Sequence, residues 1–140
     1  MPPVAATGVL RAVAAVPPLR VVVVDDDAAF RVLLGEVLAA GGVHVVGTAS
    51  DGAAGIELVS SLRPDAVTMD LEMPGMNGVE ATRAIACADD APPVVIVSGS
   101  ASSELVDEAI AAGAVALISK SRIGAELVPA LHDALAAAHR

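Results

Sequence analysis

The stretch Leu19-Arg20-Val21-Val22-Val23-Val24-Asp25-Asp26-Asp27 decides the fold, because a short continuous apolar run ends there in three acids. Three further apolar runs end in polar side chains in the same way: residues 66–69 before Asp70, residues 94–97 before Ser98, and residues 115–118 before Ser119 and Lys120. Such runs are typical of strands that are buried on both faces of a parallel sheet. The carboxyl ends of those strands meet at one edge, where open α/β sheets bind ligands.

Amphipathic segments separate the runs and predict helices. The first follows Asp27, stops at Gly41-Gly42 and places five apolar side chains on one face: Phe30, Leu33, Leu34, Val37 and Leu38. A further strand is expected over residues 43–48. Helix starts are predicted at capping residues, namely Asp51, Asn77 and Ser102 or Ser103, and the third helix is expected to run to about residue 88. The last helix is predicted to bury Leu127, Leu131, Ala134, Leu135 and Ala138, and to bend at Pro129.

Five strands therefore alternate with five helices. Right-handed crossovers place the helices on both faces of a parallel sheet, which predicts a doubly wound α/β fold. A chain of 140 residues fits one such domain, with residues 19–140 as the folded part and residues 1–18, rich in Ala, Val and Pro, as a flexible extension.

Composition excludes several classes of function. A net charge of −9 repels nucleic-acid phosphates and anionic lipid, so direct nucleic-acid binding is not expected. No apolar stretch approaches the roughly 20 residues of a membrane span. The single cysteine, Cys87, cannot form an internal disulfide, and we expect a reducing, cytoplasmic compartment.

The polar strand ends suggest a chemistry. Neighbouring carboxylates repel each other unless a positive charge lies between them, and Mg²⁺ prefers oxygen ligands of this kind. A carboxylate such as Asp70 can then act as a nucleophile for phosphorus, with Lys120, the chain's single lysine, neutralising charge and the Ser98 hydroxyl donating a hydrogen bond.

Four motifs in this order resemble the receiver domain of bacterial two-component response regulators. They are Val24-Asp25-Asp26, Asp70-Leu71-Glu72-Met73-Pro74-Gly75-Met76-Asn77-Gly78, Val97-Ser98-Gly99 and Ile118-Ser119-Lys120. The resemblance implies a flavodoxin-like five-stranded parallel sheet of order 2-1-3-4-5. It also implies a signalling domain that takes a phosphoryl group from a sensor histidine kinase or phosphotransfer protein and relays the signal by a change of conformation.

The same resemblance assigns roles to individual residues. Asp70 would be the phosphoacceptor, and Ser98 and Lys120 would contact the phosphoryl group. Mg²⁺ would be held by Asp25, Asp26 and Asp70 together with the backbone carbonyl of Glu72. Asp27 fits the ordinary role of a helix N-cap.

Three positions depart from the family pattern. Ser121 follows Lys120 where the family usually has proline, and Leu117 stands where many members carry a switch aromatic. Pro129 lies on the last helix, which with the fourth helix and fifth strand forms the face that the family often uses for homodimers.

Two other functions are compatible with the sequence. An aspartate-nucleophile phosphohydrolase would use Glu72, two residues after Asp70, as a general acid or base. The chain could equally be the receiver part of a longer DNA-binding transcription regulator.

Overall fold

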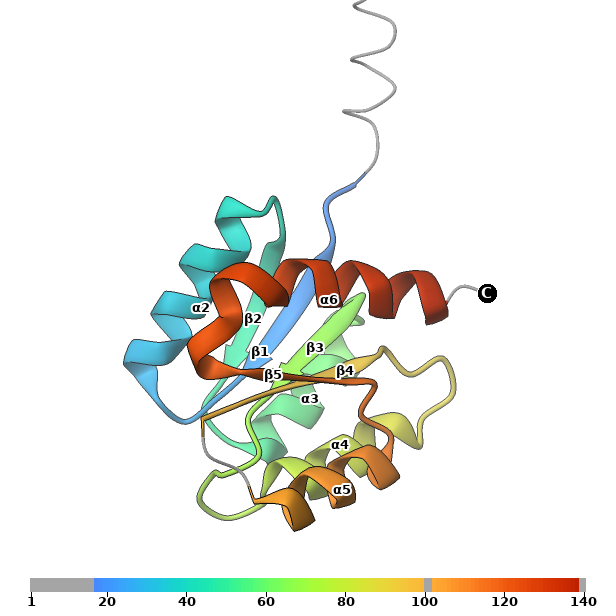
Figure 1. The fold of residues 1–140 in the computed structure, drawn as a ribbon. Helices are drawn as coiled ribbons and strands as arrows, with labels where there is room; N and C mark the ends of the chain where they lie inside the picture. Colours follow the sequence, from blue (N-terminus) through green and yellow to red (C-terminus); the bar gives the residue numbers. More distant parts are fainter. Residues whose placement is uncertain (1–16, 100–101, 139–140) are drawn as a thin grey trace, which may run out of the picture.

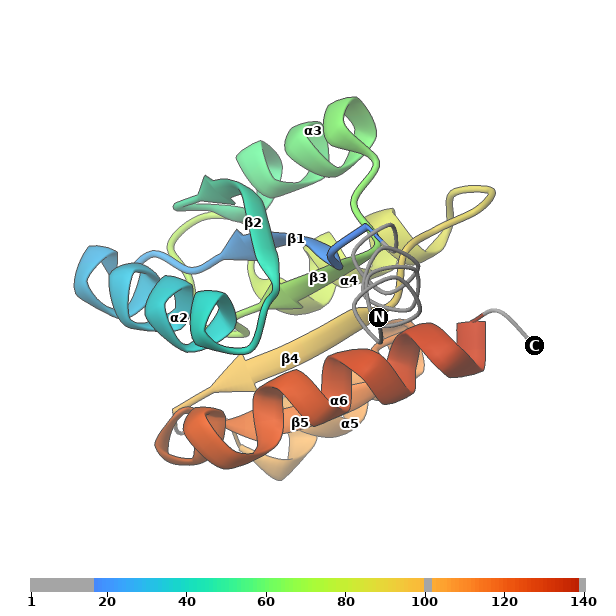
Figure 2. The same cartoon turned by 90° about the horizontal axis from the view of Figure 1, so that it is seen from above.

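The computed structural model describes residues 17–99 and 102–138, and these form one parallel sheet with helices on both faces (Figures 1 and 2). The strands are β1 (Arg20–Val24), β2 (His44–Ala49), β3 (Ala66–Met69), β4 (Val94–Ser98) and β5 (Ala116–Ser119). The helices are α2 (Ala28–Ala40), α3 (Gly52–Leu62), α4 (Gly78–Ala86), α5 (Ser103–Ala112), the short 3₁₀ helix η1 (Lys120–Arg122) and α6 (Ile123–Ala138).

The sheet has five parallel strands in the order β2-β1-β3-β4-β5. This confirms the predicted doubly wound fold and its strand order. The order places β1 and β3 side by side near the middle, so that the residues following these two strands become neighbours at one edge.

Successive side chains of a strand point to opposite faces of the sheet, so the apolar core has two parts, one on each face. Val22 and Val24 face a cluster beneath α3, α4 and α5, whereas Val21 and Val23 face a cluster beneath α2 and α6. All four side chains are essentially inaccessible to solvent. Figure 1 shows the corresponding layers, with α2 and α6 on one side of the sheet and the other three helices opposite. Burial on both faces explains why these strands are continuous apolar runs.

The predicted helix caps are confirmed. The side chains of Asp27, Asp51 and Asn77 accept hydrogen bonds from backbone N–H groups in the first turns of α2, α3 and α4. Ser102, rather than Ser103, caps α5 by accepting from the Leu105 N–H. These bonds satisfy backbone donors that a helix leaves without partners at its start.

Some details differ from the sequence-based expectation. Leu33 is 46 % exposed and does not share the buried face of Leu34 and Leu38. The fifth strand begins at Ala116, which leaves Val115 outside it and 55 % exposed.

The ends of two helices also differ. Helix α4 stops at Ala86, with exposed Cys87 as its C-cap. Helix α6 continues through Pro129, and it buries Ile123 whereas Ala138 is exposed. A proline removes one hydrogen bond without ending a helix when packing on both sides of it holds the axis, as Leu127 and Leu131 do here.

Most of the proposed extension at residues 1–18 lies outside the described residues. Within the part that is described, no helix combines the length and apolar character that a bilayer span requires.

We predict that Gly78→Ala destabilises the domain by about 2 to 4 kcal/mol, because overpacking against rigid backbone is costly. A Cβ at Gly78 would overlap the Asp70 carbonyl oxygen and lie 2.7 Å from the Leu71 Cα. Urea unfolding measures the loss.

The control is Gly35→Ala, in the middle of α2, where a Cβ meets nothing within 4 Å. That change should stabilise the helix by about 0.5 to 1 kcal/mol. Equal effects of the two substitutions would contradict the close approach of α4 to the end of β3.

Candidate functional site

Three carboxylates converge at the carboxyl edge of the sheet. Asp25 and Asp70 directly follow β1 and β3, in which Val24 is paired with Met69. One carboxylate oxygen from each of Asp25, Asp26 and Asp70 lies within 4.8 Å of the others. Asp25 and Asp70 are 1 % and 5 % exposed, whereas Asp26 is exposed to solvent. The predicted acid cluster is therefore assembled as expected.

Local backbone contacts hold Asp25 in place. Its N–H donates to the Ala49 carbonyl at 3.0 Å, and its Oδ1 accepts from the Asp27 N–H at 2.8 Å. The guanidinium of Arg31 donates from Nη1 to the Asp25 carbonyl at 2.7 Å. Sequence reasoning missed Arg31, although its position one turn into the helix that follows the acids offered a signal.

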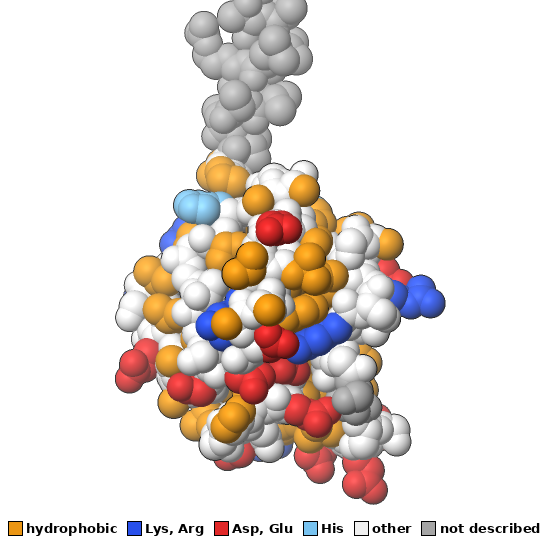
Figure 3. Space-filling view, turned by 90° about the vertical axis from the view of Figure 1, so that its left-hand side faces the viewer, with side chains coloured by type: hydrophobic (Ala, Val, Ile, Leu, Met, Phe, Trp, Pro, Cys, Tyr) orange, Lys and Arg blue, Asp and Glu red, His pale blue; other side chains and the backbone are white. Residues whose placement is uncertain are grey.

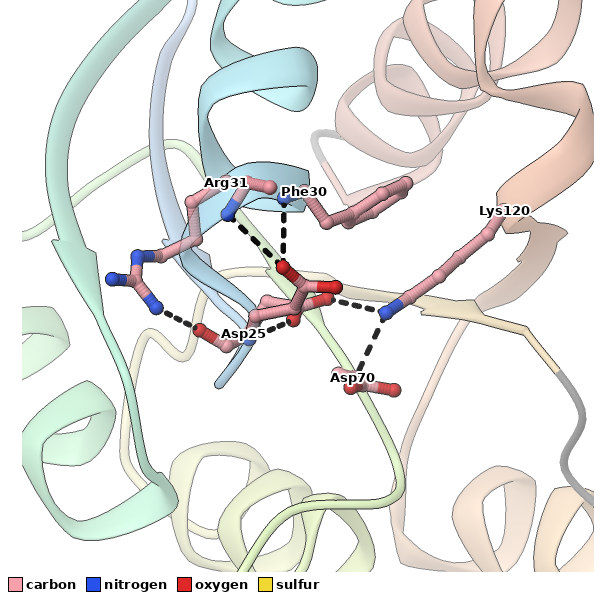
Figure 4. Close-up of polar contacts among 7 residues, drawn as sticks. Asp25, Phe30, Arg31, Asp70 and Lys120 are labelled. Atoms are coloured by element: carbon pink, nitrogen blue, oxygen red, sulfur yellow. Dashed lines mark hydrogen bonds and ion pairs between the residues drawn. The ribbon is translucent and has the colours of Figure 1, made fainter.

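Lys120 lies between two of the acids (Figure 4). Its Nζ is 2.9 Å from Asp25 Oδ2 and 3.5 Å from Asp70 Oδ2. The ring of Phe30 lies beside the same ammonium, with its centroid 4.3 Å from Nζ. The sequence predicted Lys120 next to Asp70, but it gave no sign of the shorter contact with Asp25 or of the contact with Phe30.

The electrostatics of Asp70 reflect this crowding. Burial, together with the charges of Asp25 and Asp26, raises the pKa of Asp70 to about 6, although Lys120 and the backbone of Glu72 oppose the shift. The pKa of Lys120 is raised, because its hydrogen bond to Asp25 and the charges of Asp25 and Asp70 outweigh partial burial. One ammonium does not balance three carboxylates.

Ser98 ends β4, the strand next to β3, and is 6 % exposed. Its buried Oγ has no hydrogen-bond partner among the described residues. Buried hydroxyls without partners are uncommon in folded proteins, and they often mark a place where a ligand completes the hydrogen bonding.

The donor set fits a hard divalent cation. Carboxylate oxygens are the ligands that Mg²⁺ prefers, and the three acids are close enough to share one ion. The backbone of Glu72 favours the ionised form of Asp70 and so opposes the rise of its pKa, which places this loop beside the cluster. Figure 3 shows acidic side chains gathered around basic ones, below a more apolar area.

The chain belongs to the response regulator receiver family. The family model described as "Response regulator receiver domain" matches residues 21–132. The chain is also similar to the chemotaxis protein CheY of Thermotoga maritima, with 37 % identity over 113 residues that cover 81 % of this chain and 94 % of CheY.

Other relatives are longer than this chain. It is 43 % identical over 136 residues to protein-glutamate methylesterase/protein-glutamine glutaminase 5 of Myxococcus xanthus. That match covers 89 % of this chain and 39 % of the relative. The chain therefore spans about two fifths of the length of this relative.

Solved structures agree with the fold. The receiver domain of the response regulator NarL from Mycobacterium tuberculosis superposes with a TM-score of 0.81 at 34 % identity, covering 86 % of this chain and 98 % of that one. The response regulator domain of Thermotoga maritima CheB gives 0.78 at 32 % identity, covering 85 % and 97 %. A cluster of acids at the end of β1 and β3 fits the phosphoacceptor site of this family.

The departures from the family pattern lie just beyond the site. Ser121, where the family usually has proline, makes a 2.9 Å hydroxyl contact with Ser119 at the start of η1, and within the described residues no peptide bond is cis. Leu117 is 45 % exposed, at the outer edge of the sheet.

We predict that Asp70→Asn stabilises the metal-free protein at pH 7.5. Because the pKa is raised from 3.8 to about 6, the folded state holds this proton more tightly than the unfolded chain. Stability is therefore lost as pH rises between these values, and the ionised carboxylate costs on the order of 2 kcal/mol above them. Urea unfolding in the presence of a chelator should show the gain at pH 7.5 and little of it near pH 3.5.

Asp27→Asn is the matched control, because asparagine also caps helices and Asp27 is exposed. It should give no comparable gain. Adding Mg²⁺ should stabilise the wild type more than Asp70→Asn. A variant no more stable than the wild type at pH 7.5 would contradict the crowding of charge at Asp70.

Proposed function

We propose that Asp70 is the phosphoacceptor of this receiver domain. The observation that carries the proposal is the convergence of Asp25, Asp26 and the Lys120 ammonium on one nearly buried carboxylate. A nucleophile for phosphorus needs positioning and charge neutralisation more than covalent help. The strand ends offer the positioning, Lys120 supplies part of the neutralisation, and a cation held by the acids would supply the rest.

The proposed reaction is a single phosphoryl transfer. A carboxylate oxygen of Asp70 attacks the phosphorus of a phosphohistidine, and an acyl phosphate bond forms as the P–N bond breaks. The imidazole of the donor keeps the bonding electron pair and takes up a proton. Lys120 then pairs with an oxygen of the transferred group, and the Ser98 hydroxyl donates to another.

Asp25, Asp26 and Asp70 would hold Mg²⁺ together with the backbone carbonyl of Glu72. A bound Mg²⁺ supplies positive charge to oxygens of the incoming phosphoryl group. The position of the three acids supports this assignment, and the loop at Glu72 lies close enough to contribute. Because β1 and β3 are buried on both faces of the sheet, the acids that directly follow these strands are held in position.

The proposed partner is a sensor histidine kinase or a phosphotransfer protein. The net charge of −9 opposes binding of this chain to nucleic acid. The exposed Cys87 thiol suits a reducing, cytoplasmic compartment. We propose that the domain signals by stoichiometric phosphorylation, with turnover limited to loss of its own acyl phosphate.

The first test is intact mass after incubation with a small phosphodonor such as acetyl phosphate. We expect the wild type to gain one phosphoryl mass in the presence of Mg²⁺ and none in the presence of a chelator. Asp70→Asn should gain none, because the amide is not a nucleophile for phosphorus. Hydroxylamine should remove the added mass, as it does from acyl phosphates.

Equal labelling of wild type and Asp70→Asn would exclude Asp70 as the acceptor. Repeated turnover of a phosphate ester in excess over protein would favour the phosphohydrolase instead. Asp65→Asn is a suitable control, since Asp65 accepts a hydrogen bond from the Arg20 N–H at the opposite ends of the strands. It should be labelled like the wild type.

We also propose that a second copy of the chain pairs through the face formed by α5, β5 and α6. Ile110, Val115 and Leu117 are 57 %, 55 % and 45 % exposed, and they place an apolar strip beside the edge strand β5. Exposed apolar patches and free sheet edges are common sites of association.

Leu117→Glu is predicted to weaken such a dimer at least tenfold, because it places a charge in the apolar strip. Sedimentation velocity with and without phosphodonor measures the change. Leu33→Glu, on α2, is the matched control for an exposed leucine. A phosphorylated wild type that stays monomeric at high concentration would contradict the proposal.

A further inference from the structure

The chain's single phenylalanine contacts its single lysine. Phe30 lies in the first turn of α2, and Lys120 begins η1 directly after β5. The two elements are 80 residues or more apart in sequence, yet the Lys120 Nζ is 4.3 Å from the centroid of the Phe30 ring. Figure 4 shows the ring beside the lysine side chain, next to the acids.

This ammonium needs to be held in position. A lysine side chain is flexible and its charge is compact and strongly hydrated. The side chain of Lys120 is 23 % exposed, and its Nζ lies nearer to Asp25, at 2.9 Å, than to Asp70, at 3.5 Å. The ion pairs alone therefore hold the amine more closely at Asp25 than at the proposed acceptor.

The face of an aromatic ring supplies a third contact. Its negative potential attracts a cation within about 6 Å of the centroid, and the attraction increases when water is partly excluded. A divalent cation held by the acids competes with Lys120 for Asp25, but it does not compete for the ring. The ring therefore keeps a place for the amine that is independent of the state of Asp25.

We propose that Phe30 is a positioning residue that keeps the Lys120 ammonium within reach of a phosphoryl group on Asp70. The proposal rests on the proposed function of Asp70. It assigns to Phe30 a role beyond packing, since the ring is only partly buried against the cluster beneath α2 and α6. Leu34 and Leu38 on the same helix are fully buried and supply the packing of that face.

The composition of the chain allows a direct test in the metal-free protein. With lysine labelled by ¹³C and ¹⁵N, NMR reports Lys120 alone, and with phenylalanine also selectively labelled, nuclear Overhauser contacts to its ring protons report Phe30 alone. In the wild type we expect these contacts and an upfield ring-current shift of the Lys120 Hε protons. Phe30→Tyr should retain both features, whereas Phe30→Leu should lose the shift and make the lysine side chain more mobile.

The second test compares Mg²⁺ affinity, with the same lysine signal followed during the titration. If the ring gives the ammonium another contact when Mg²⁺ takes Asp25, Phe30→Leu should weaken Mg²⁺ binding about two- to fivefold, because the ammonium without the ring competes more strongly for that carboxylate. Phe30→Tyr should bind Mg²⁺ like the wild type. A residue that only packs the core would leave this affinity unchanged in a folded variant.

The third test is the rate of phosphorylation by a small phosphodonor at saturating Mg²⁺. Phe30→Leu should lower this rate about three- to tenfold, with the change in the maximal rate rather than in the half-saturating donor concentration. Phe30→Tyr should restore it. Leu33→Ala, an exposed position on the same helix, should leave the rate unchanged.

Phe30→Leu with an unaltered lysine signal, or with wild-type Mg²⁺ affinity and phosphorylation rate, would overturn the proposal. If the wild type itself takes up no phosphoryl group, the proposed function of Asp70 fails. The lysine signal and the Mg²⁺ titration of the metal-free protein still decide whether Phe30 positions the amine.

Discussion

Concentrated negative charge at one edge of the sheet is the constraint on which the rest of the structure depends. Two nearly buried carboxylates, Asp25 and Asp70, follow neighbouring strands, and the third acid completes a group whose oxygens lie within 4.8 Å. Such an arrangement is unfavourable until a cation offsets it, and burial together with the neighbouring acids raises the pKa of Asp70. Lys120 offsets it in part, and the remaining negative charge is what makes the site suited to a divalent cation.

The scaffold tolerates this unfavourable edge because it is rigid elsewhere. Val21 to Val24 pack alternately into the two aliphatic clusters, so β1 cannot shift along its axis without moving its side chains to the wrong face. At the end of β3 the backbone approaches Gly78 so closely that no side chain fits there. Packing far from the acids thus fixes the positions of their carboxylates. No electrostatic attraction within the cluster is needed to keep them there.

The sequence predicted most of the fold, since four apolar runs ending in polar residues define the strands and their shared edge. It also predicted which residues assemble the site, because that depends only on strand order and on position along each strand. Periodicity could not tell that Leu33 lies outside the buried face of α2, since five apolar residues there exceed what one face of the helix buries. The contact of Phe30 with Lys120 could not be predicted, because it depends on side-chain directions between elements distant in sequence. Arg31 on the Asp25 carbonyl was missed although the two residues are close in sequence, because the pattern does not show where the guanidinium points.

Two departures from the family pattern, Leu117 and Ser121, lie on the segment that joins Lys120 to the surface of the domain. Lys120 directly follows β5, Ser98 pairs with Ser119, and Leu117 stands on the same strand three residues before the lysine. A change in the position of the amine must therefore be absorbed by η1 or by β5. The Ser119–Ser121 contact lies at the start of η1, and Leu117 is already exposed, so such a shift moves no aromatic ring between buried and exposed positions. The link between the acids and the outer edge is thus a single short strand and the turn that follows it.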